Sequence, residues 1–499
     1  MAGLTVLFML TRLSVSGFKN LVDAQVSFGP FTCLAGANGV GKSNLFDAIR
    51  FLSNLAEDSL QEAGLTVRDP ISRNSSLESL FTKTGEGHAD TMRFEAEMIV
   101  PPTGTDDLGQ PATAQITYLR YRLVLGYEAD SVVSTRGRLV IREEELTHIN
   151  AGDARQSLGF AHRAEWRKSV IMGRRTVPFI STEQRDNEGY VLLHQDGISG
   201  RPRAYKASTL VRTILSAADA GFAATTLVAK REMQSWQLLQ LELSALRQPD
   251  SFGVSAHLTA NGLHLPATLY RLAQQGTTKA EQEACYARVS SRLAELNDDV
   301  RRIRVERDEK RELLSLEMED RSGIRHSAWA LSDGTLRFLA LTVIGEDKEA
   351  GRVLCVEEPE NGIHPALIEA VLQLLQDIAT DTYLTAGDDN PLRQVIITTH
   401  SPVVVQLVPE DCLVVAERVQ AIQAGRRSLS QVRFSALPGT WRTTGSRPMW
   451  ELQPGKLLHY LNAAPAQHET PDSVGAAFKR IAARLEPEQL PLFGNGHAD

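Results

Sequence analysis

The chain has 499 residues, 42% of them hydrophobic and 23% charged, and a net charge of -8. This length exceeds one ordinary core, so we expect two or three folding units of a globular protein. No apolar run approaches the ~20 residues that span a bilayer, and the negative charge disfavours a protein that coats nucleic acid indiscriminately. The four cysteines lie far apart and match no zinc spacing, which is typical of a protein in the reducing cytoplasm.

The amino-terminal segment is apolar but has neither a basic leader nor a small-residue cleavage site, so it does not predict a signal peptide. Met9 opens a cleaner first strand, LTRLSVSGF, and we expect the residues before it to form an unstructured extension. Two more runs, AQVSF and FTCLAG, resemble strands. Apolar residues at helical spacing then predict a helix over residues 43–58.

Alternating segments within residues 92–150 predict a meander of antiparallel strands. Residues 155–206 are predicted to be loop-rich and locally basic, and residues 206–300 largely helical. The run VRRIRVERDEKRELLSLEMEDRSG predicts a strand pair. From residue 331 the pattern is helix, buried strand, helix, buried strand, which predicts a parallel sheet, and the last ~30 residues are predicted to form a loose tail.

A glycine-rich segment, GANGVGKS at residues 36–43, fits the pattern G-x-x-x-x-G-K-[ST]. It follows an apolar strand and opens a helix, which is the context that a phosphate-binding loop requires. The glycines let backbone N–H groups turn toward phosphate oxygens, and the helix N-terminus adds a positive end. In such a loop Lys42 reaches the terminal phosphates and Ser43 binds Mg²⁺. The flanking strand and helix disfavour the alternative, a turn that only resembles the motif.

Polar residues also end two apolar strands further along the chain. VLCVEEPE delivers Glu357 and Glu358 at a strand tip, where one carboxylate could hold Mg²⁺ through water and the other could polarise an attacking water. QVIITTHSP ends in His400, which could sense a phosphate by a hydrogen bond. The alternatives are a solvated strand end and a structural histidine. LSDGTLRFLAL predicts a helix start with Ser332 or Asp333 as its N-cap.

In this order the motifs resemble those of the ABC-type ATPase heads of the RecF, SMC and OLD-like group, over roughly residues 10–90 and 325–415. GANGVGKSN resembles their Walker A motif, VLCVEEPE their Walker B, LSDGT their signature, ENGIHP their D-loop region and THSP their switch histidine. LSVSGFKNL resembles their first strand, whose Phe-Lys pair lies near the nucleotide. Glu357 stands where transporter-type ATPases usually carry Asp, and the glutamine-loop residue has no clear candidate beyond Gln61, chosen by position only.

The resemblance implies that ATP and Mg²⁺ are bound, with Lys42, Glu358 and His400 as catalytic residues and Ser43 and Glu357 as metal-binding residues. It implies that the signature motif binds the γ-phosphate of ATP held by the other subunit. The implied nucleotide-binding residues are Gly36, Asn38, Gly39, Gly41, Lys42, Ser43, Asn44, Ser332, Asp333 and Gly334.

We therefore expect an α/β protein, a P-loop ABC-type ATPase head with a mixed sheet, flanking helices and an inserted helical and β subdomain. The expected units are the N-terminal half of the head (9–90), an antiparallel β and basic loop region (91–205), a helical insertion with a strand pair (206–324), the C-terminal half of the head (325–420), and a C-terminal extension and tail (421–499).

The functional hypotheses follow from the same resemblance. The chain has no sustained heptads for SMC arms, and no D-x-D follows Glu417, so a Toprim nuclease within the chain is not expected. The compact branch of the group often belongs to bacterial anti-phage systems. We expect an ATP-dependent homodimer, able to assemble further, that responds to DNA with a nuclease or toxin as effector partner. The second hypothesis is a scaffold that controls an effector without contacting DNA, and the third, a membrane transporter's ATPase, is disfavoured. The basic residues of 155–206 fit nucleic-acid binding and a solvated insertion equally well.

Overall fold

A mostly parallel sheet forms the centre of the molecule in the computed structural model, which describes residues 9–67, 76–84, 87–129, 137–197, 200–350, 353–423, 426–453 and 455. Five of its strands run parallel, β22 is antiparallel to β21, and β23 is parallel to β22. In spatial order the strands are β14 (Trp236–Leu239), β19 (Val353–Glu357), β20 (Gln394–Thr399), β3 (Phe31–Ala35), β21 (Leu413–Gln423), β22 (Arg426–Ala436) and β23 (Trp450–Glu451). The parallel sheet predicted from the alternating strands and helices is confirmed.

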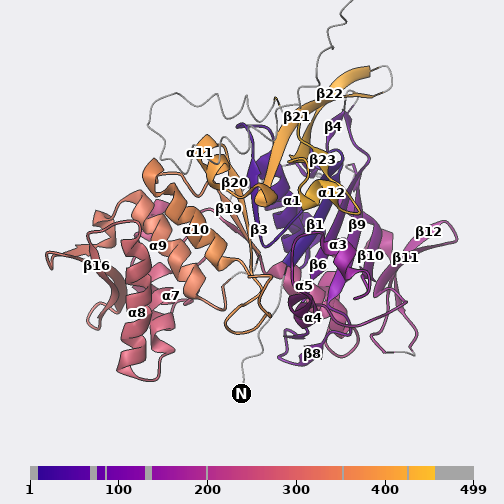
Figure 1. Cartoon of the computed structure of the whole chain (residues 1–499). Coiled ribbons are helices and arrows are strands. Elements are labelled where there is room, and N and C mark those ends of the chain that lie inside the picture. The colour runs from indigo at the N-terminus through magenta and orange to yellow at the C-terminus, as the bar shows by residue number, and fades with distance from the viewer. Residues whose placement is uncertain are drawn as a thin grey trace, which may run out of the picture.

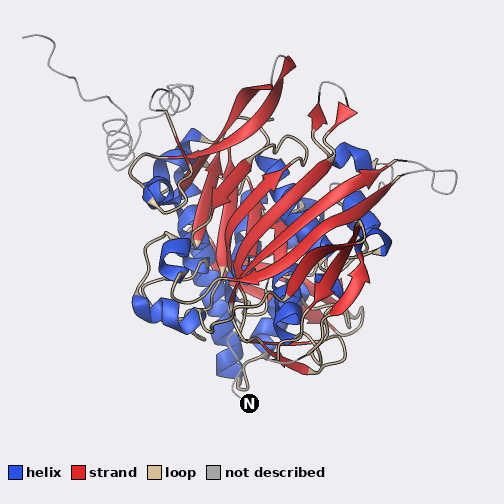
Figure 2. Cartoon of the chain, turned by 90° about the vertical axis from the view of Figure 1, so that its right-hand side faces the viewer, coloured by secondary structure: helices blue, strands red, loops and turns tan. Residues whose placement is uncertain are grey.

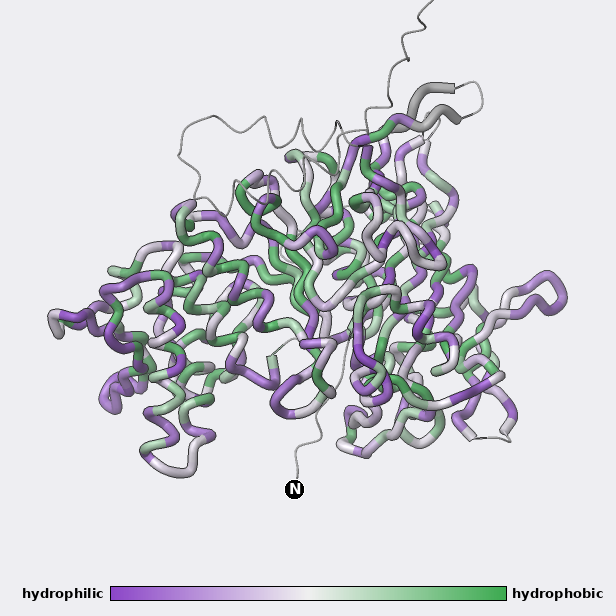
Figure 3. The backbone as a smooth tube through the Cα atoms, in the orientation of Figure 1, coloured by the Kyte–Doolittle hydropathy of each residue, from purple (hydrophilic) through white to green (hydrophobic). Residues whose placement is uncertain are grey.

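Both faces of this sheet are buried, which explains why its strands are continuous apolar runs. Successive side chains of a strand point to opposite faces. In β19, Val353 and Cys355 belong to one hydrophobic core, and Leu354 and Val356 belong to another. Figure 3 shows the hydrophobic colour along these central strands and more hydrophilic colour at the outer tips of the molecule.

The first of these cores lies between the central sheet and an eight-stranded antiparallel sheet, which Figure 2 shows broad side on. Helices α1 (Lys42–Leu55), α2 (Leu60–Leu65) and α5 (Ala224–Gln234) contribute to the same core. In spatial order the strands of the large sheet are β13 (Arg203–Lys206), β12 (Glu188–Leu193), β11 (Ile180–Arg185), β10 (Arg138–His148), β9 (Tyr118–Glu128), β6 (Thr91–Ile99), β1 (Met9–Ser16) and β2 (Ala24–Ser27).

The predicted meander is confirmed by β6, β9 and β10, but the loop-rich prediction for 155–206 is wrong in part. Strands β11, β12 and β13 lie within that region and extend the large sheet, and the short helices α3 (Ala154–Leu158) and α4 (Ala164–Val170) precede them in the chain. These edge strands carry many charged residues, and such a composition is also typical of loops.

The second core packs helices against the other face of the central sheet, on the left in Figure 1. A small sheet of β15 (Asp250–Ser251), β16 (Val300–Asp308), β17 (Leu313–Asp320) and β18 (Arg325–Ser327) caps these helices, so the predicted strand pair is confirmed. The helices are α7 (Leu265–Gln274), α8 (Lys279–Ala294), α9 (Asp333–Glu346), α10 (Ile368–Ile378) and α11 (Pro402–Leu407).

Two sequence predictions near this layer have different outcomes. Ser332 is the N-cap of α9, as predicted, and its hydroxyl accepts a hydrogen bond from Thr335 N at 3.2 Å. The helical prediction for 206–300 missed β14, which forms one edge of the central sheet.

Within the described residues, no helix combines the length and the apolar character that crossing a membrane requires. The predicted amino-terminal extension and carboxyl-terminal tail lie outside the described residues.

Candidate functional site at the ends of the central strands

The glycine-rich loop connects the end of β3 to the start of α1. Gly39 and Gly41 have φ values of 72° and 122°, a region that residues with a Cβ rarely adopt. A Cβ on Gly36 would lie 2.7 Å from the carbonyl oxygen of Ala416 on β21. The amide of Asn20 donates a hydrogen bond to Val40 O at 3.0 Å. The loop is therefore clamped by segments from both ends of the chain.

Lys42 folds back over this loop. Its ammonium donates to Gly36 O at 2.5 Å and to Ala37 O at 3.0 Å. Burial lowers the pKa of Lys42, although the carboxylates of Glu358 and Glu360 act in the opposite direction. A phosphate offered to the loop would give this ammonium a stronger, anionic acceptor than the two carbonyls.

Glu357 ends β19 and faces the first turn of α1. Hydrogen bonds from Ser43 and Gln240 reach its carboxylate. Burial raises the pKa of Glu357, and the nearby Asp47 carboxylate adds to this. The sheet register explains why Gln240 reaches Glu357. Leu239 pairs with Val356, so the residues that follow them, Gln240 and Glu357, lie beside each other.

Glu358 follows β19 with an unusual backbone conformation and fixed polar contacts. Its φ is 47°, which is uncommon for a residue with a side chain and is held by a hydrogen bond from Glu358 N to Thr398 O at 2.9 Å. His400 Nδ1 lies 2.6 Å from Glu358 Oε1, and Asn361 Nδ2 donates to Oε2 at 2.8 Å. Burial alone would raise the pKa of Glu358, but the contacts with Asn361 and His400 outweigh it and lower the pKa. The carboxylate is therefore ionised at neutral pH and positioned from both sides.

These residues line one pocket of about 600 Å³, a size typical of sites for small molecules. The pocket brings together the glycine-rich loop and the ends of β14, β19 and β20, as the carboxyl ends of parallel strands meet at one edge. Its lining consists of Asn38, Gly39, Gly41, Lys42, Ser43, Asn44, Gln240, Leu241, Arg337, Glu357, Glu358, Asn361 and Thr398. His400 reaches the site through its contact with Glu358.

The LSDGT segment lies elsewhere. Ser332 and Asp333 are exposed, and none of residues 332–334 is among those that line the pocket. Arg247 holds the segment from its own chain, donating to Asp333 Oδ1 at 2.7 Å and to Leu331 O at 3.2 Å. A Cβ on Gly334 would lie 2.7 Å from Gly362 O. The start of α9 therefore packs tightly on the loop that follows Asn361.

A family model described as "AAA domain, putative AbiEii toxin, Type IV TA system" matches residues 31–97 and 208–406, more than half of the chain. The chain belongs to this family. This family and the curated relatives RecF and Smc support the resemblance to ABC-type ATPases of the RecF/SMC group, and the predicted α/β fold with a mixed sheet and flanking helices is confirmed.

Curated relatives match short segments only. The DNA replication and repair protein RecF of Parabacteroides distasonis is 48% identical over 46 residues, which are 9% of this chain and 13% of the relative. The chromosome partition protein Smc of Thauera aminoaromatica is 37% identical over 91 residues, 16% of this chain and 7% of the relative. The match therefore covers a small part of these relatives.

Two solved structures resemble most of the chain at low identity. One is an Smc head bound to the C-winged helix domain of ScpA, with 14% identity, a TM-score of 0.44, and coverage of 86% of this chain and 98% of that one. The other is an Smc head domain with an extended coiled coil, bound to the C-terminal domain of ScpA derived from Pyrococcus furiosus. It has 13% identity, a TM-score of 0.44, and coverage of 86% and 97%.

Sequence reasoning missed four polar side chains of this pocket: Gln240, Arg337, Asn361 and Thr398. Gln61 lies on α2 and is not among the lining residues. The available signal for Gln240 was its position directly after the short run WQLL, the same pattern that indicated Glu357 and His400. Asn361 stands in ENG, three residues after Glu358.

The residues of the pocket fit Mg²⁺ better than a metal that requires three or more protein side chains as ligands. Within the part of the chain that the structure describes, no group of three or more His, Cys, Asp or Glu side chains could hold a metal. Mg²⁺ instead uses one or two protein oxygens together with water and phosphate. The hydrogen-bonded pair of Ser43 and Glu357 supplies two such oxygens.

Proposed function

We propose that the chain binds ATP in this pocket and hydrolyses it with Mg²⁺, and that two copies sandwich two ATP molecules. The observation that carries the proposal is the convergence of Lys42, Ser43, Glu357 and Glu358 in one pocket, with the signature motif exposed outside it. The geometry supports the roles that the sequence motifs suggested.

In this proposal Glu358 orients the attacking water and accepts its proton, since its carboxylate is ionised and held by His400 and Asn361. Lys42 leaves the loop carbonyls and binds the terminal phosphate. Ser43 and Glu357 would hold Mg²⁺, which would supply positive charge near the phosphates. Asn38, Asn44 and the loop N–H groups bind the remaining phosphate oxygens.

The dimer proposal rests on the position of the signature motif. Ser332 caps α9 and is exposed, and none of residues 332–334 lines the pocket of its own chain. A helix N-terminus attracts anions. A second copy, arranged head to tail, would bring this end to the ATP of the first. Each ATP site would then contain residues of both chains.

A complementation experiment tests this arrangement. Lys42→Ala removes the phosphate contact, and Ser332→Asp keeps an N-cap residue but places a carboxylate against the partner's ATP. Each variant alone should lose ATPase activity. A mixture forms heterodimers with one intact site, in which the Ser332→Asp chain supplies Lys42 and the Lys42→Ala chain supplies Ser332. A mixture as inactive as its components would contradict the composite site, and full activity of Ser332→Asp alone would contradict the role of the signature motif.

We further propose that the ATPase acts in DNA-related genome maintenance or anti-phage defence, with slow or triggered turnover and an effector such as a nuclease or toxin. The names of the matched relatives support a DNA-related role. The charges of the β16 strand do not support DNA binding there, because its arginines pair with neighbouring acids: Arg301 with Glu319, Arg302 with Glu283, Arg304 with Glu317 and Arg307 with Glu309.

The second candidate is an ATP-dependent scaffold that controls an effector without contacting DNA. The paired arginines of β16 favour it, and within 155–206 Arg185 pairs with Glu183, Lys206 with Glu188 at 2.5 Å and Arg203 with Asp219 at 3.8 Å. DNA binding by Glu358→Gln, measured by fluorescence anisotropy with ATP and Mg²⁺ across a salt series, separates the two. ATP-dependent, salt-sensitive binding supports the DNA role. Its absence, in protein shown to hold ATP, supports the scaffold.

A further inference from the structure

Arg337 is a charged residue of the pocket that lacks a partner. It lies on α9, is half-buried, and lines the pocket with Lys42, Glu358 and Asn361. Its Nε is buried without a hydrogen-bond acceptor. Among the described residues we also find no ion pair for its guanidinium. Buried donors in proteins are nearly always paired, so an unpaired guanidinium that faces a cavity points to a ligand.

The acids that could neutralise Arg337 are occupied by other groups. Asp333 stands four residues earlier on the same helix, the usual spacing for an ion pair, but its partner is Arg247 at 2.7 Å. Both carboxylate oxygens of Glu358 are bound, one by His400 and the other by Asn361. The carboxylate of Glu357 receives Ser43 and Gln240. This arrangement leaves Arg337 available to an anion from outside the chain.

The start of α9 places Arg337 on the side of the pocket formed by Glu358 and Asn361. Gly334 packs on Gly362, the residue after Asn361, and Arg337 follows less than one helical turn later. Glu358 is the residue proposed to orient water at the terminal phosphate. A cation beside it would offset the repulsion between this carboxylate and the phosphate, and a guanidinium can bind two phosphate oxygens at once.

We propose that Arg337 binds the terminal phosphate of the ATP held by its own chain and makes the pocket select ATP over ADP. This inference rests on the proposed function, because it requires ATP in this pocket. Ser332 is the exposed N-cap of the helix that carries Arg337. Phosphate binding in one chain would thus fix the helix end that the same chain offers to its partner, and so link the two ATP sites of the dimer.

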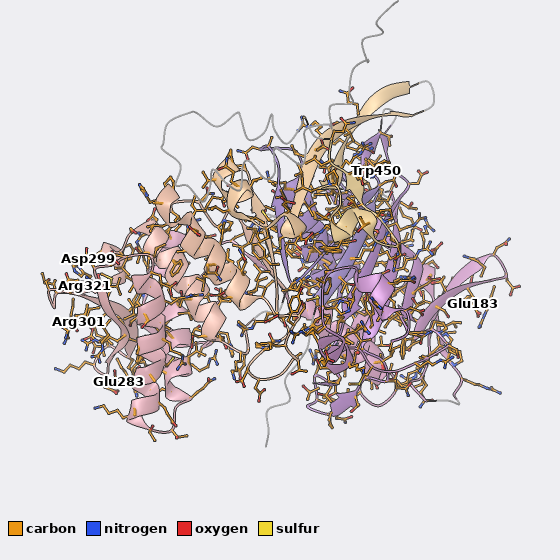
Figure 4. The ribbon with its side chains drawn as sticks, in the orientation of Figure 1. Glu183, Glu283, Asp299, Arg301, Arg321 and Trp450 are labelled. Carbon is orange, nitrogen blue, oxygen red and sulfur yellow. The ribbon has the colours of Figure 1, made fainter. Side chains whose placement is uncertain are left out.

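Nucleotide affinity tests the assignment. We would measure binding of a fluorescent, non-hydrolysable ATP analogue and of the matching ADP to the full chain. Arg337→Ala should weaken binding of the ATP analogue about tenfold or more and change ADP binding less than about twofold, since ADP lacks the contacted phosphate. Arg337→Lys keeps the positive charge but lacks the paired N–H donors of a guanidinium, so it should give an intermediate affinity for the analogue. The control is Arg321→Ala, an exposed arginine at the outer tip of the β16–β17 sheet (Figure 4), which should match wild type for both nucleotides.

Each result has a separate meaning. Equal affinities of Arg337→Ala and wild type for both nucleotides would overturn the inference and leave the proposed ATP site intact. Equal losses for ATP and ADP would also overturn it, because the effect would not depend on the terminal phosphate. A wild-type protein that binds neither nucleotide would overturn the proposed function itself. Thermal unfolding of Arg337→Ala should match that of wild type. If it does not, the affinities of Arg337→Lys for the ATP analogue and for ADP test the inference instead.

Discussion

His400 Nδ1 lies 2.6 Å from Glu358 Oε1, although the two residues are 42 positions apart in the chain. The contact exists because β19 and β20 are parallel neighbours and each residue directly follows its strand. Together with Asn361, His400 fixes the orientation of the carboxylate proposed to activate water. A histidine in this position would respond to a phosphate that approaches the same carboxylate.

Glu358→Gln should reduce the ATPase rate by about 100-fold or more, because the amide cannot accept a proton from water. ATP affinity should remain close to wild type, and ATP-bound dimers should accumulate. Single-turnover hydrolysis and light scattering with ATP and Mg²⁺ measure the two effects. Glu369→Gln, which changes an exposed glutamate on α10, is the matched control. Hydrolysis by Glu358→Gln at the control's rate would exclude this role.

Asn361→Ala should move the acidic limb of the pH–rate profile to higher pH. Asn361 and His400 hold the pKa of Glu358 below its ordinary range, so the carboxylate stays ionised as the pH falls. The same lowered pKa also contributes to stability. Ionised Glu358 stabilises the fold at pH values above the unfolded-state pKa of about 4.3, and this contribution is lost as the pH falls through the folded-state pKa. Loss of the Asn361 donor raises that pKa. Asn361→Asp, which adds a like charge, should shift the limb further, and superimposable profiles of all three proteins would refute the effect.

Gln240→Ala should raise the Mg²⁺ concentration for half-maximal ATPase activity by about tenfold, a typical loss when a group that orients a metal ligand is removed. The change removes a hydrogen bond to Glu357 at the end of β19. Binding of ATP without Mg²⁺ should not change. A Mg²⁺ titration of the ATPase rate measures this, with Gln61→Ala on α2 as the control. The assignment fails if the two alanine variants need equal Mg²⁺.

Glu144→Ala should destabilise the fold by about 2–4 kcal/mol in urea unfolding, through loss of a buried acceptor. The Glu144 carboxylate is fully buried and accepts hydrogen bonds from Ile214 N at 2.8 Å, Leu215 N at 2.9 Å and the Tyr121 hydroxyl at 3.2 Å. The adjacent Glu145 is partly exposed, 3.8 Å from Arg122. Glu145→Ala should therefore cost less than about 1 kcal/mol. Similar costs for the two variants would contradict this account.

The parts of the site that could be predicted from the sequence are those at the ends of apolar strands. Residues 353–357 and 394–399 are long enough and apolar enough to identify buried parallel strands, and the polar residues at their carboxyl ends meet at one edge. β14 has only four residues, too few to distinguish a strand from a turn of helix, so Gln240 was not found. Arg337 lies within a helix whose pattern predicts only burial, and its position in the pocket depends on how that helix packs.

The strands that flank β3 in the central sheet determine at what stage of chain synthesis the site can form. Both adjacent strands, β20 and β21, come from residues beyond 393, and the carbonyl of Asn20 accepts a hydrogen bond from Val432 N at 3.2 Å. At about 5–20 residues per second, a ribosome needs roughly 20–70 s between the end of β3 and the start of β20. A nascent or prematurely terminated chain therefore carries the glycine-rich loop without the frame that shapes it. We therefore expect nucleotide binding only in chains that are long enough to contain β20 and β21.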